Sequence, residues 1–235
     1  MSTRAPAQVT LREATPGDVE ECARICFAAF GGLDDHHRFP RDFPVLEAAL
    51  EIMDAWIGHP SIWGVVAEAD GRVVGSNFLD ERDPIAGVGP ITVDPDFQDA
   101  GIGRRLMEAV MERGREAPGI RLLQDAFHMR SLSLYSSLGF DVKDPVVVAV
   151  GTPRGAPAPG VDARPMEEAD LGQCEELSVA VHGYPRTNAL RDALAMTTPW
   201  LALRDGRVVA YCAGTAFWPL NHGVAETPVD MAGLL

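Results

Sequence analysis

The chain has 235 residues, of which 46% are hydrophobic and 23% are charged, as in a folded globular protein rather than a disordered one. Its formal net charge of −14 argues against DNA or RNA as a partner, because phosphates would be repelled and the basic residues are scattered. No apolar run approaches the about 20 residues of a membrane span, and the first residues lack a signal-peptide core. The four cysteines lack the pair spacing of a metal site, so we expect a reduced, cytoplasmic protein without a bound metal.

The first expected elements are a short strand from Val9 and an amphipathic helix. Thr15 is suited to cap this helix, and Asp18 places a carboxylate in its first turn. Residues 43–57 predict a second helix, which would follow a connecting loop.

A β-hairpin is predicted over residues 61–79, with its turn at Asp70-Gly71, a dipeptide that tolerates positive φ. The strand that follows contains Pro90, which cannot donate a ladder hydrogen bond. This strand is therefore either a kinked edge strand or a strand splayed from its neighbour. Splaying would leave the main-chain groups of Ile91 and Val93 free for an amide-bearing ligand.

The most informative segment is a strand–turn–helix whose turn reads Gln-x-x-Gly-x-Gly from Gln98 to Gly103. Unpaired N–H groups at the start of the helix, near Gly101, attract anions, and glycines let the backbone approach a diphosphate closely. Arg104 adds a positive charge. A dinucleotide-binding fingerprint would need a third glycine where Leu106 stands, so this alternative fits less well.

The chain then predicts a strand over 120–126, a helix over about 130–138, and closing strands around Phe140 and over 146–150. Within the helix, Tyr135 is either a half-buried core aromatic or an acid. A phenol with a pKa near 10 can protonate a thiolate leaving group. The order of elements predicts a mixed α/β domain.

An internal repeat is visible, because residues 9–31 align without a gap onto residues 161–183. A second hairpin turn at 205–209 repeats residues 70–74. The second copy is short and has no Gln-x-x-Gly-x-Gly loop, so we interpret it as degenerate and non-catalytic. Such a fragment would need cover from the first copy or from a homodimer. The expected domains are residues 1–151 and 161–235, joined by the linker 152–160.

Two motifs together resemble the GNAT superfamily of N-acetyltransferases. Residues 98–103 match its Q/R-x-x-G-x-G/A loop, and residues 128–140 match its N-x-x-[AS]-x-x-L-Y-x-x-x-G-F helix. The resemblance covers Val9 to about Gly151. It implies a GNAT-like fold, with a central mixed, mostly antiparallel sheet flanked by helices, plus a partial second copy.

The resemblance implies transfer of an acetyl group from acetyl-CoA to a small-molecule or peptide amine, by direct attack in a ternary complex. Tyr135 would be the general acid for the CoA thiolate. Some relatives carry a Glu where this chain has Leu123, so another group must handle the proton of the amine. Glu81, Asp80 and Asp125 are the candidates, although exposed loop charges are an equal interpretation of the first two.

The resemblance also implies a cofactor site. The pantetheine arm would lie against one strand and the diphosphate on the loop, while His128 replaces a cofactor-contacting Asn. These cofactor-contacting residues are Ile91, Thr92, Val93, Gln98, Asp99, Ala100, Gly101, Ile102, Gly103, Arg104 and His128.

Asp34-Asp35-His36-His37, expected in the loop between the first two helices, would border the acceptor in this fold. A solvated loop is the preferred interpretation over a metal site, since the spacing matches no metal signature. A catalytically silent acyl-CoA-binding sensor or assembly module is the alternative function.

Overall fold

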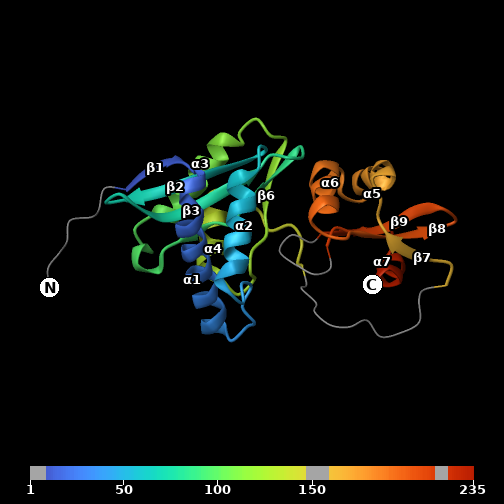
Figure 1. Ribbon diagram of the computed structural model, residues 1–235, viewed down its shortest axis with the longest axis horizontal. Helices are drawn as coiled ribbons and strands as arrows, with labels where there is room; N and C mark the ends of the chain where they lie inside the picture. Colours follow the sequence, from blue (N-terminus) through green and yellow to red (C-terminus); the bar gives the residue numbers. More distant parts are fainter. Residues whose placement is uncertain (1–8, 147–158, 215–221) are drawn as a thin grey trace. The chain divides into compact units, whose positions relative to one another are not determined.

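The computed structural model describes residues 9–146, 159–214 and 222–235, and the chain forms two compact units (Figure 1). The first unit spans Met1–Val142 and the second spans Lys143–Leu235. Each unit has its own sheet and its own buried core. Across the described ranges, no helix is both long and apolar enough to cross a membrane.

The first unit has a mixed sheet in the order β1-β2-β3-β4-β6, with β5 paired to β3. All of its neighbouring strands are antiparallel except β4 and β6. This arrangement confirms the predicted α/β class with a mostly antiparallel sheet flanked by helices. The elements in chain order are β1 (Val9–Glu13), the 3-10 turn η1 (Pro16–Asp18), α1 (Val19–His37), α2 (Leu46–Gly58), β2 (Ile62–Ala69), β3 (Arg72–Asp80), β4 (Ile85–Val88), β5 (Thr92–Val93), the 3-10 turn η2 (Pro95–Phe97), α3 (Ile102–Arg113), β6 (Gly119–Leu122) and α4 (Met129–Ser137).

Asp18 ties the start of α1 to β1. Its buried carboxylate accepts from the main-chain N–H and the hydroxyl of Thr15, both at 2.8 Å, and from both terminal nitrogens of Arg12. The Arg12 guanidinium, hydrogen bonded to the carboxylate, lowers the pKa of Asp18 to about 2. The predicted start of the helix is therefore held by an ion pair between Arg12 of β1 and Asp18, in addition to the contact of Asp18 with Thr15.

Helix α1 is longer than predicted. It ends at His37 with Arg38 in the left-handed conformation, so Asp34–His37 form its last turn. The prediction that these residues lie in a loop is therefore wrong. Gly31 does not end the helix; it is buried within it, and a side chain there would meet the guanidinium of Arg41 at 3.1 Å.

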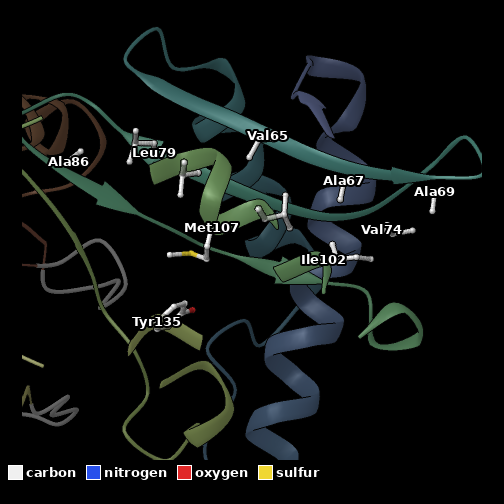
Figure 2. Packing of buried hydrophobic residues seen from close by; sticks show 11 residues of the cluster. Val65, Ala67, Ala69, Val74, Leu79, Ala86, Ile102, Met107 and Tyr135 are labelled. Atoms are coloured by element: carbon white, nitrogen blue, oxygen red, sulfur yellow. The ribbon is translucent and has the colours of Figure 1, made fainter. Parts of the chain in front are cut away.

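Two layers of helix cover the sheet of the first unit. Val65 and Ala67 of β2 belong to the buried cluster that includes Leu106 and Met107 of α3 (Figure 2). Val66 lies between them and points to the opposite face, since successive side chains of a strand alternate. Helices α1 and α2, side by side in Figure 1, pack on that opposite face.

The strand predicted around Pro90 is interrupted in the structure. Val88 of β4 still faces Leu79 of β3, and pairing with β3 resumes at Thr92 of β5. Gly89 between them has a positive φ of 126° and a cis peptide bond to Pro90. Since β6 pairs with β4 only as far as Val88, β5 keeps one edge without a strand partner among the described residues.

The predicted closing strands are not present where the structure describes them. Phe140 and the residues up to 146 have no strand conformation. The prediction for 147–150 lies outside the described residues.

The second unit has a four-stranded antiparallel sheet in the order β10-β9-β8-β7. Its core gathers side chains from helices and strands, including Leu177, Leu190 and Tyr211. Its elements are β7 (Asp162–Pro165), the 3-10 turn η3 (Glu168–Asp170), α5 (Leu171–His182), α6 (Thr187–Met196), β8 (Trp200–Arg204), β9 (Arg207–Cys212), β10 (Gly223–Ala225) and α7 (Pro228–Leu234).

The two units share local structure in corresponding positions. Arg164 binds both oxygens of Asp170 just as Arg12 binds Asp18. The hairpin turns have the positive φ angles predicted from their sequence: 51° and 76° at Asp70-Gly71, and 53° and 77° at Asp205-Gly206. Strand, 3-10 turn, two helices and hairpin follow in the same order in both units.

Candidate functional site

The loop between β5 and α3 is held at its start by a buried carboxylate. Asp94 is 5% exposed, accepts from the main-chain N–H of Asp96 at 3.0 Å and pairs with Arg24 of α1 at 3.1 Å. The main-chain N–H of Asp94 donates to the carbonyl of Val74 in β3. These contacts hold the start of the loop, at Asp94, against β3 and α1.

The start of α3 has free hydrogen-bond donors. The Arg105 N–H donates to the carbonyl of Gly101. The N–H groups of residues 99–104 have no hydrogen-bond acceptor among the described residues. Gly101 has a positive φ of 77°, no side-chain cap and open space where a side chain would be. The first turn of α3 also carries no acidic residue. This helix end can therefore bind an anion through its main chain.

The predicted loop residues have different surroundings. Gln98, Asp99, Ala100, Gly101 and Arg104 are exposed, whereas the Ile102 side chain is buried in the core, so only its main chain can contact a ligand. Gly103 is close to α4, because a side chain there would meet Leu134 at 3.7 Å. Gly103 therefore lies where α3 is next to α4, with room for a small side chain.

Arg130 of α4 reaches the loop from the side. It pairs with the carboxylate of Asp99 at 2.6 Å and donates to the side-chain oxygen of Gln98 at 3.3 Å. Asp99 itself adopts a positive φ of 67°, which is uncommon for a residue with a side chain. Together with Arg104, Arg130 gives the loop two exposed guanidinium groups.

The free edge of β5 carries main-chain groups that point away from β3. Thr92 and Asp94 face β3, as the register and the bond from Asp94 to Val74 require, so the alternating residues Ile91 and Val93 face the other way. The Val93 carbonyl accepts from Gln98 at 3.4 Å. The splayed-strand interpretation thus fits Ile91 and Val93, while the main chain of Thr92 is already used by the sheet.

Tyr135 lies in the core of the first unit, and only 8% of it is exposed (Figure 2). Its ring packs edge-on against Phe140, with the ring centroids 6.2 Å apart. Burial raises the pKa of its hydroxyl to about 12, although a hydrogen bond from Ser131 opposes this rise. The phenol therefore stays protonated at neutral pH.

His128 immediately precedes α4. Its Nδ1 lies 3.0 Å from the hydroxyl oxygen of Ser131, and its main-chain N–H donates to the carbonyl of Asp125. Burial lowers the pKa of the imidazole, while the nearby Asp125 carboxylate raises it. The imidazole is half-buried and close to two polar side chains of its own segment.

Three carboxylates gather where the end of α1 meets the segment before α4. The main-chain N–H of Asp42 donates to Asp34, which is 3% exposed, and His37 packs against Phe127 with ring centroids 4.6 Å apart. Burial and the charges of Asp34 and Asp125 raise the pKa of Asp42 to about 7. Burial also raises the pKa of Asp125. The last turn of α1, predicted to border the acceptor, thus lies beside Asp125.

Glu81 and Asp80, the other proton-handling candidates, are engaged elsewhere. Glu81 pairs with Arg113 at 2.9 Å, at the end of α3 opposite the glycine loop, about 18 Å away along a helix of 12 residues. Asp80 binds both the Nε and the Nη2 of Arg82. The Glu81 carboxylate is therefore engaged in an ion pair with Arg113, away from the glycine loop.

Asp42 and Arg130 are functional candidates that no sequence motif indicates. Asp42 lies in an irregular segment whose neighbours in space are distant in sequence. Arg130 looks like an ordinary exposed helix charge until its contact with Asp99 is known. Ser131 occupies a motif position without a sequence-based role. The structure also shows no group of three or more His, Cys, Asp or Glu suited to a metal ion among the residues it describes.

Comparison with known sequences identifies relatives of the first unit. Residues 32–140 match the sequence model of the acetyltransferase (GNAT) family. A mycothiol acetyltransferase of Thermomonospora curvata is 38% identical over 139 residues, 57% of this chain and 45% of that protein. A mycothiol acetyltransferase of Nocardiopsis dassonvillei is 34% identical over 85 residues, 35% of this chain and 26% of that protein. This chain thus spans less than half the length of the two relatives it matches.

Solved structures share the fold at low sequence identity. A Pyrococcus horikoshii protein described as a candidate acetyltransferase aligns over 100% of this chain and 77% of its own, with a TM-score of 0.64 and 16% identity. An aminoglycoside N-acetyltransferase solved with CoA aligns over 64% of this chain and 99% of its own, with a TM-score of 0.50 and 15% identity. At these identities the likeness concerns the fold.

Proposed function

The first unit of this chain belongs to the acetyltransferase (GNAT) family, and from this premise we propose that it transfers the acetyl group of acetyl-CoA to a primary amine. The observation that carries the proposal is the uncapped start of α3, where the N–H groups of residues 99–104 are available to a diphosphate. The matched range 32–140 includes this loop and Tyr135.

The residues present fit acetyl-CoA as a substrate. Ile91 and Val93 offer main-chain groups at the free edge of β5 to the amide groups of the pantetheine arm. Open space at Gly101 admits a bulky phosphate close to the backbone. Arg104 and Arg130 supply positive charge to the diphosphate, and the two curated relatives carry the name of an acetyltransferase.

We propose that Tyr135 is the general acid. The amine attacks the thioester carbonyl directly in a ternary complex, and the phenol gives its proton to the departing sulfur. A phenol that stays protonated at neutral pH suits this role. Its burial against Phe140 also shields the phenol from bulk water.

In place of Glu81, we propose Asp125 as the carboxylate that handles the proton of the amine. Burial and the charge of Asp34 raise its pKa, and Asp42 adds a further carboxylate beside it. Negative charge at this place favours a cationic amine over a neutral acceptor. Since both curated relatives are named for mycothiol, we favour a small-molecule amine over a peptide.

We further propose that residues 1–151 form the catalytic domain, 152–160 a linker, and 161–235 a partial, degenerate copy. The order of elements, the paired Arg–Asp contacts and the hairpin turns of the two units support this interpretation. The four buried cysteines form no disulfide with one another, which fits a reducing compartment. The cytoplasmic location and the homodimer remain predictions.

The alternative function is a silent acyl-CoA-binding module, which Leu123 favours because it is 68% exposed where some relatives carry a carboxylate. Thiol release from acetyl-CoA across a panel of amines distinguishes the two functions. Release with at least one amine supports the enzyme, and CoA binding without release supports the silent module.

Paired glycine variants test the binding site itself. We expect Gly101→Val to weaken CoA binding by at least about 100-fold, because a side chain at φ 77° blocks the phosphate and strains the turn. Gly71→Val is the matched control: it has a φ of 76° and equally open space, but it lies in the hairpin turn. Both should lose about 1–2 kcal/mol of stability from backbone strain. Equal CoA affinity in the two variants would refute the site.

A further inference from the structure

Three side chains at the start of α4, each with an exchangeable proton, follow one another along the helix. His128, Ser131 and Tyr135 are three and four residues apart, so they share one face of the helix. The Ser131 oxygen lies 3.0 Å from Nδ1 of His128, and Ser131 is four residues before Tyr135, close enough for its hydroxyl to lower the pKa of the phenol. This line connects an imidazole to the proposed general acid.

The imidazole at the end of this line has a mixed electrostatic environment. Asp125, in the segment before α4, favours its charged form, whereas Arg130 of α4 and His37 of α1 oppose it. Burial has the largest effect and lowers the pKa of His128. The ring is therefore mostly neutral at neutral pH, and one nitrogen can accept a proton while the other donates one.

The hydroxyl of Ser131 has two acceptors within reach. It donates to the carbonyl of His128 at 3.0 Å in the resting geometry, and a phenolate at Tyr135 would be a much stronger acceptor. A hydroxyl that can rotate between these acceptors can pass a proton onward, since it gives one proton and receives another at the same oxygen.

We propose that His128, acting through Ser131, returns a proton to Tyr135 during acetyl transfer. This inference rests on the proposed function. It gives His128 a proton-carrying role beyond the hydrogen bond to the cofactor implied by its motif position, a role that an asparagine side chain cannot fill. Ser131 is the positioning residue between the two groups.

Each proton given up during the transfer is taken up by a named atom. The nitrogen–carbon bond forms, the carbon–sulfur bond breaks, and the sulfur takes the proton of the Tyr135 hydroxyl. The phenolate then takes the proton of Ser131, and Ser131 takes the proton from Nδ1 of His128. Asp125 accepts the proton that the amine loses and passes it, through water, to Nε2 of His128. The net change moves one proton from nitrogen to sulfur and leaves the charge of every side chain as it was.

A spectroscopic test needs no turnover. We expect the ¹⁵N shifts of His128 in the full chain to show the Nδ1–H tautomer, held by the hydrogen bond to Ser131. Ser131→Ala should shift the ring toward the Nε2–H tautomer, which imidazoles favour in water. Ser133→Ala, an exposed serine on the same helix, is the matched control and should leave the tautomer unchanged. An unchanged tautomer in Ser131→Ala would overturn the relay.

Kinetics test the same relay during turnover, with acetyl-CoA and the amine that gives the fastest thiol release. We expect Ser131→Ala and His128→Asn each to lower kcat by about 10–100-fold, with the KM for acetyl-CoA within about twofold. Ser131→Thr keeps the hydroxyl and should restore most of the rate. The double variant should have a kcat no lower than that of either single variant, because either substitution alone already interrupts the proton relay.

Two outcomes separate this inference from the proposed function. Wild-type kcat in both single variants would overturn the relay and leave acetyl transfer intact. Absence of thiol release with every amine in the wild-type chain would overturn the proposed function, and the relay in acetyl transfer with it.

Discussion

At the scale of single residues, the candidate site depends on where charges are buried rather than on which residues are charged. Glu81 and Asp125 look alike in the sequence as acidic residues near strand ends. The structure pairs Glu81 with Arg113 on the surface, whereas Asp125 is half-buried beside His128 and two other carboxylates. Desolvation and like charge change the proton affinity of the second group, and sequence alone does not reveal either effect.

Asp42 provides a prediction of pH-dependent stability. Because its pKa is raised to about 7, the folded state disfavours its ionised form, and stability falls as the pH rises from about 4 through 7. We expect Asp42→Asn to match the wild type near pH 4 and to exceed it at pH 8. After allowance for partial exposure, the gain should be roughly 1–2 kcal/mol, or a Tm higher by about 3–6 °C.

Thermal unfolding at pH 4 and pH 8 measures this effect. Asp54→Asn, which removes an exposed carboxylate from α2, controls for the change in net charge. A gain of the same size at both pH values would contradict the assigned cause.

At the scale of elements, identical residues have different outcomes because of their partners. Gly183 adopts a φ of 82° and ends α5, while the aligned Gly31 is buried inside α1. The side chain of Arg41 packs over Gly31, and α1 continues for another six residues to His37. Local sequence predicts that a helix can stop at a glycine, but only tertiary contacts decide whether it does.

The glycine loop and the hairpin turns were predictable because their conformations are local. Positive φ at Asp70-Gly71 and Gly101 follows from residue type, and so does the break in the strand at Pro90. The contacts of Arg130 with the loop and of Asp42 with Asp34 join residues that are 31 and 8 apart in the chain. No periodic pattern in the sequence encodes such contacts. The loop could therefore be predicted from the sequence, but the contacts around it could not.

The ion pair between β1 and the start of α1 gives an element-scale prediction. Asp18 has a depressed pKa of about 2, so its stabilising contribution is present above pH 4 and is lost as the pH falls toward 2. We expect Asp18→Asn to cost about 1–2 kcal/mol at pH 7, because Arg12 loses a bidentate partner, and less at pH 3.

Urea unfolding followed by circular dichroism measures both values. Asp170→Asn removes the corresponding contact with Arg164 in the second unit and should show the same dependence on pH. A cost for Asp18→Asn that does not change between pH 7 and pH 3 would show that packing, rather than charge, holds this junction.

At the scale of the whole molecule, the two units differ in how their late helices begin. The start of α3 has no side-chain cap and no acidic residue in its first turn. The start of α7 is already satisfied: Thr227 accepts from the N–H of Asp230, and the buried carboxylate of Asp230 pairs with Arg204. A diphosphate would therefore find free donors at α3 and a carboxylate at α7.

This difference predicts one CoA site per chain. Isothermal titration of the full chain with CoA should give a stoichiometry near one, because among the helices that the structure describes only α3 has an uncapped start with a glycine at positive φ. The Gly101→Val variant should then be far from saturated at CoA concentrations that just saturate the wild type. Two sites in the wild type would mean that the second unit also binds CoA and is not degenerate.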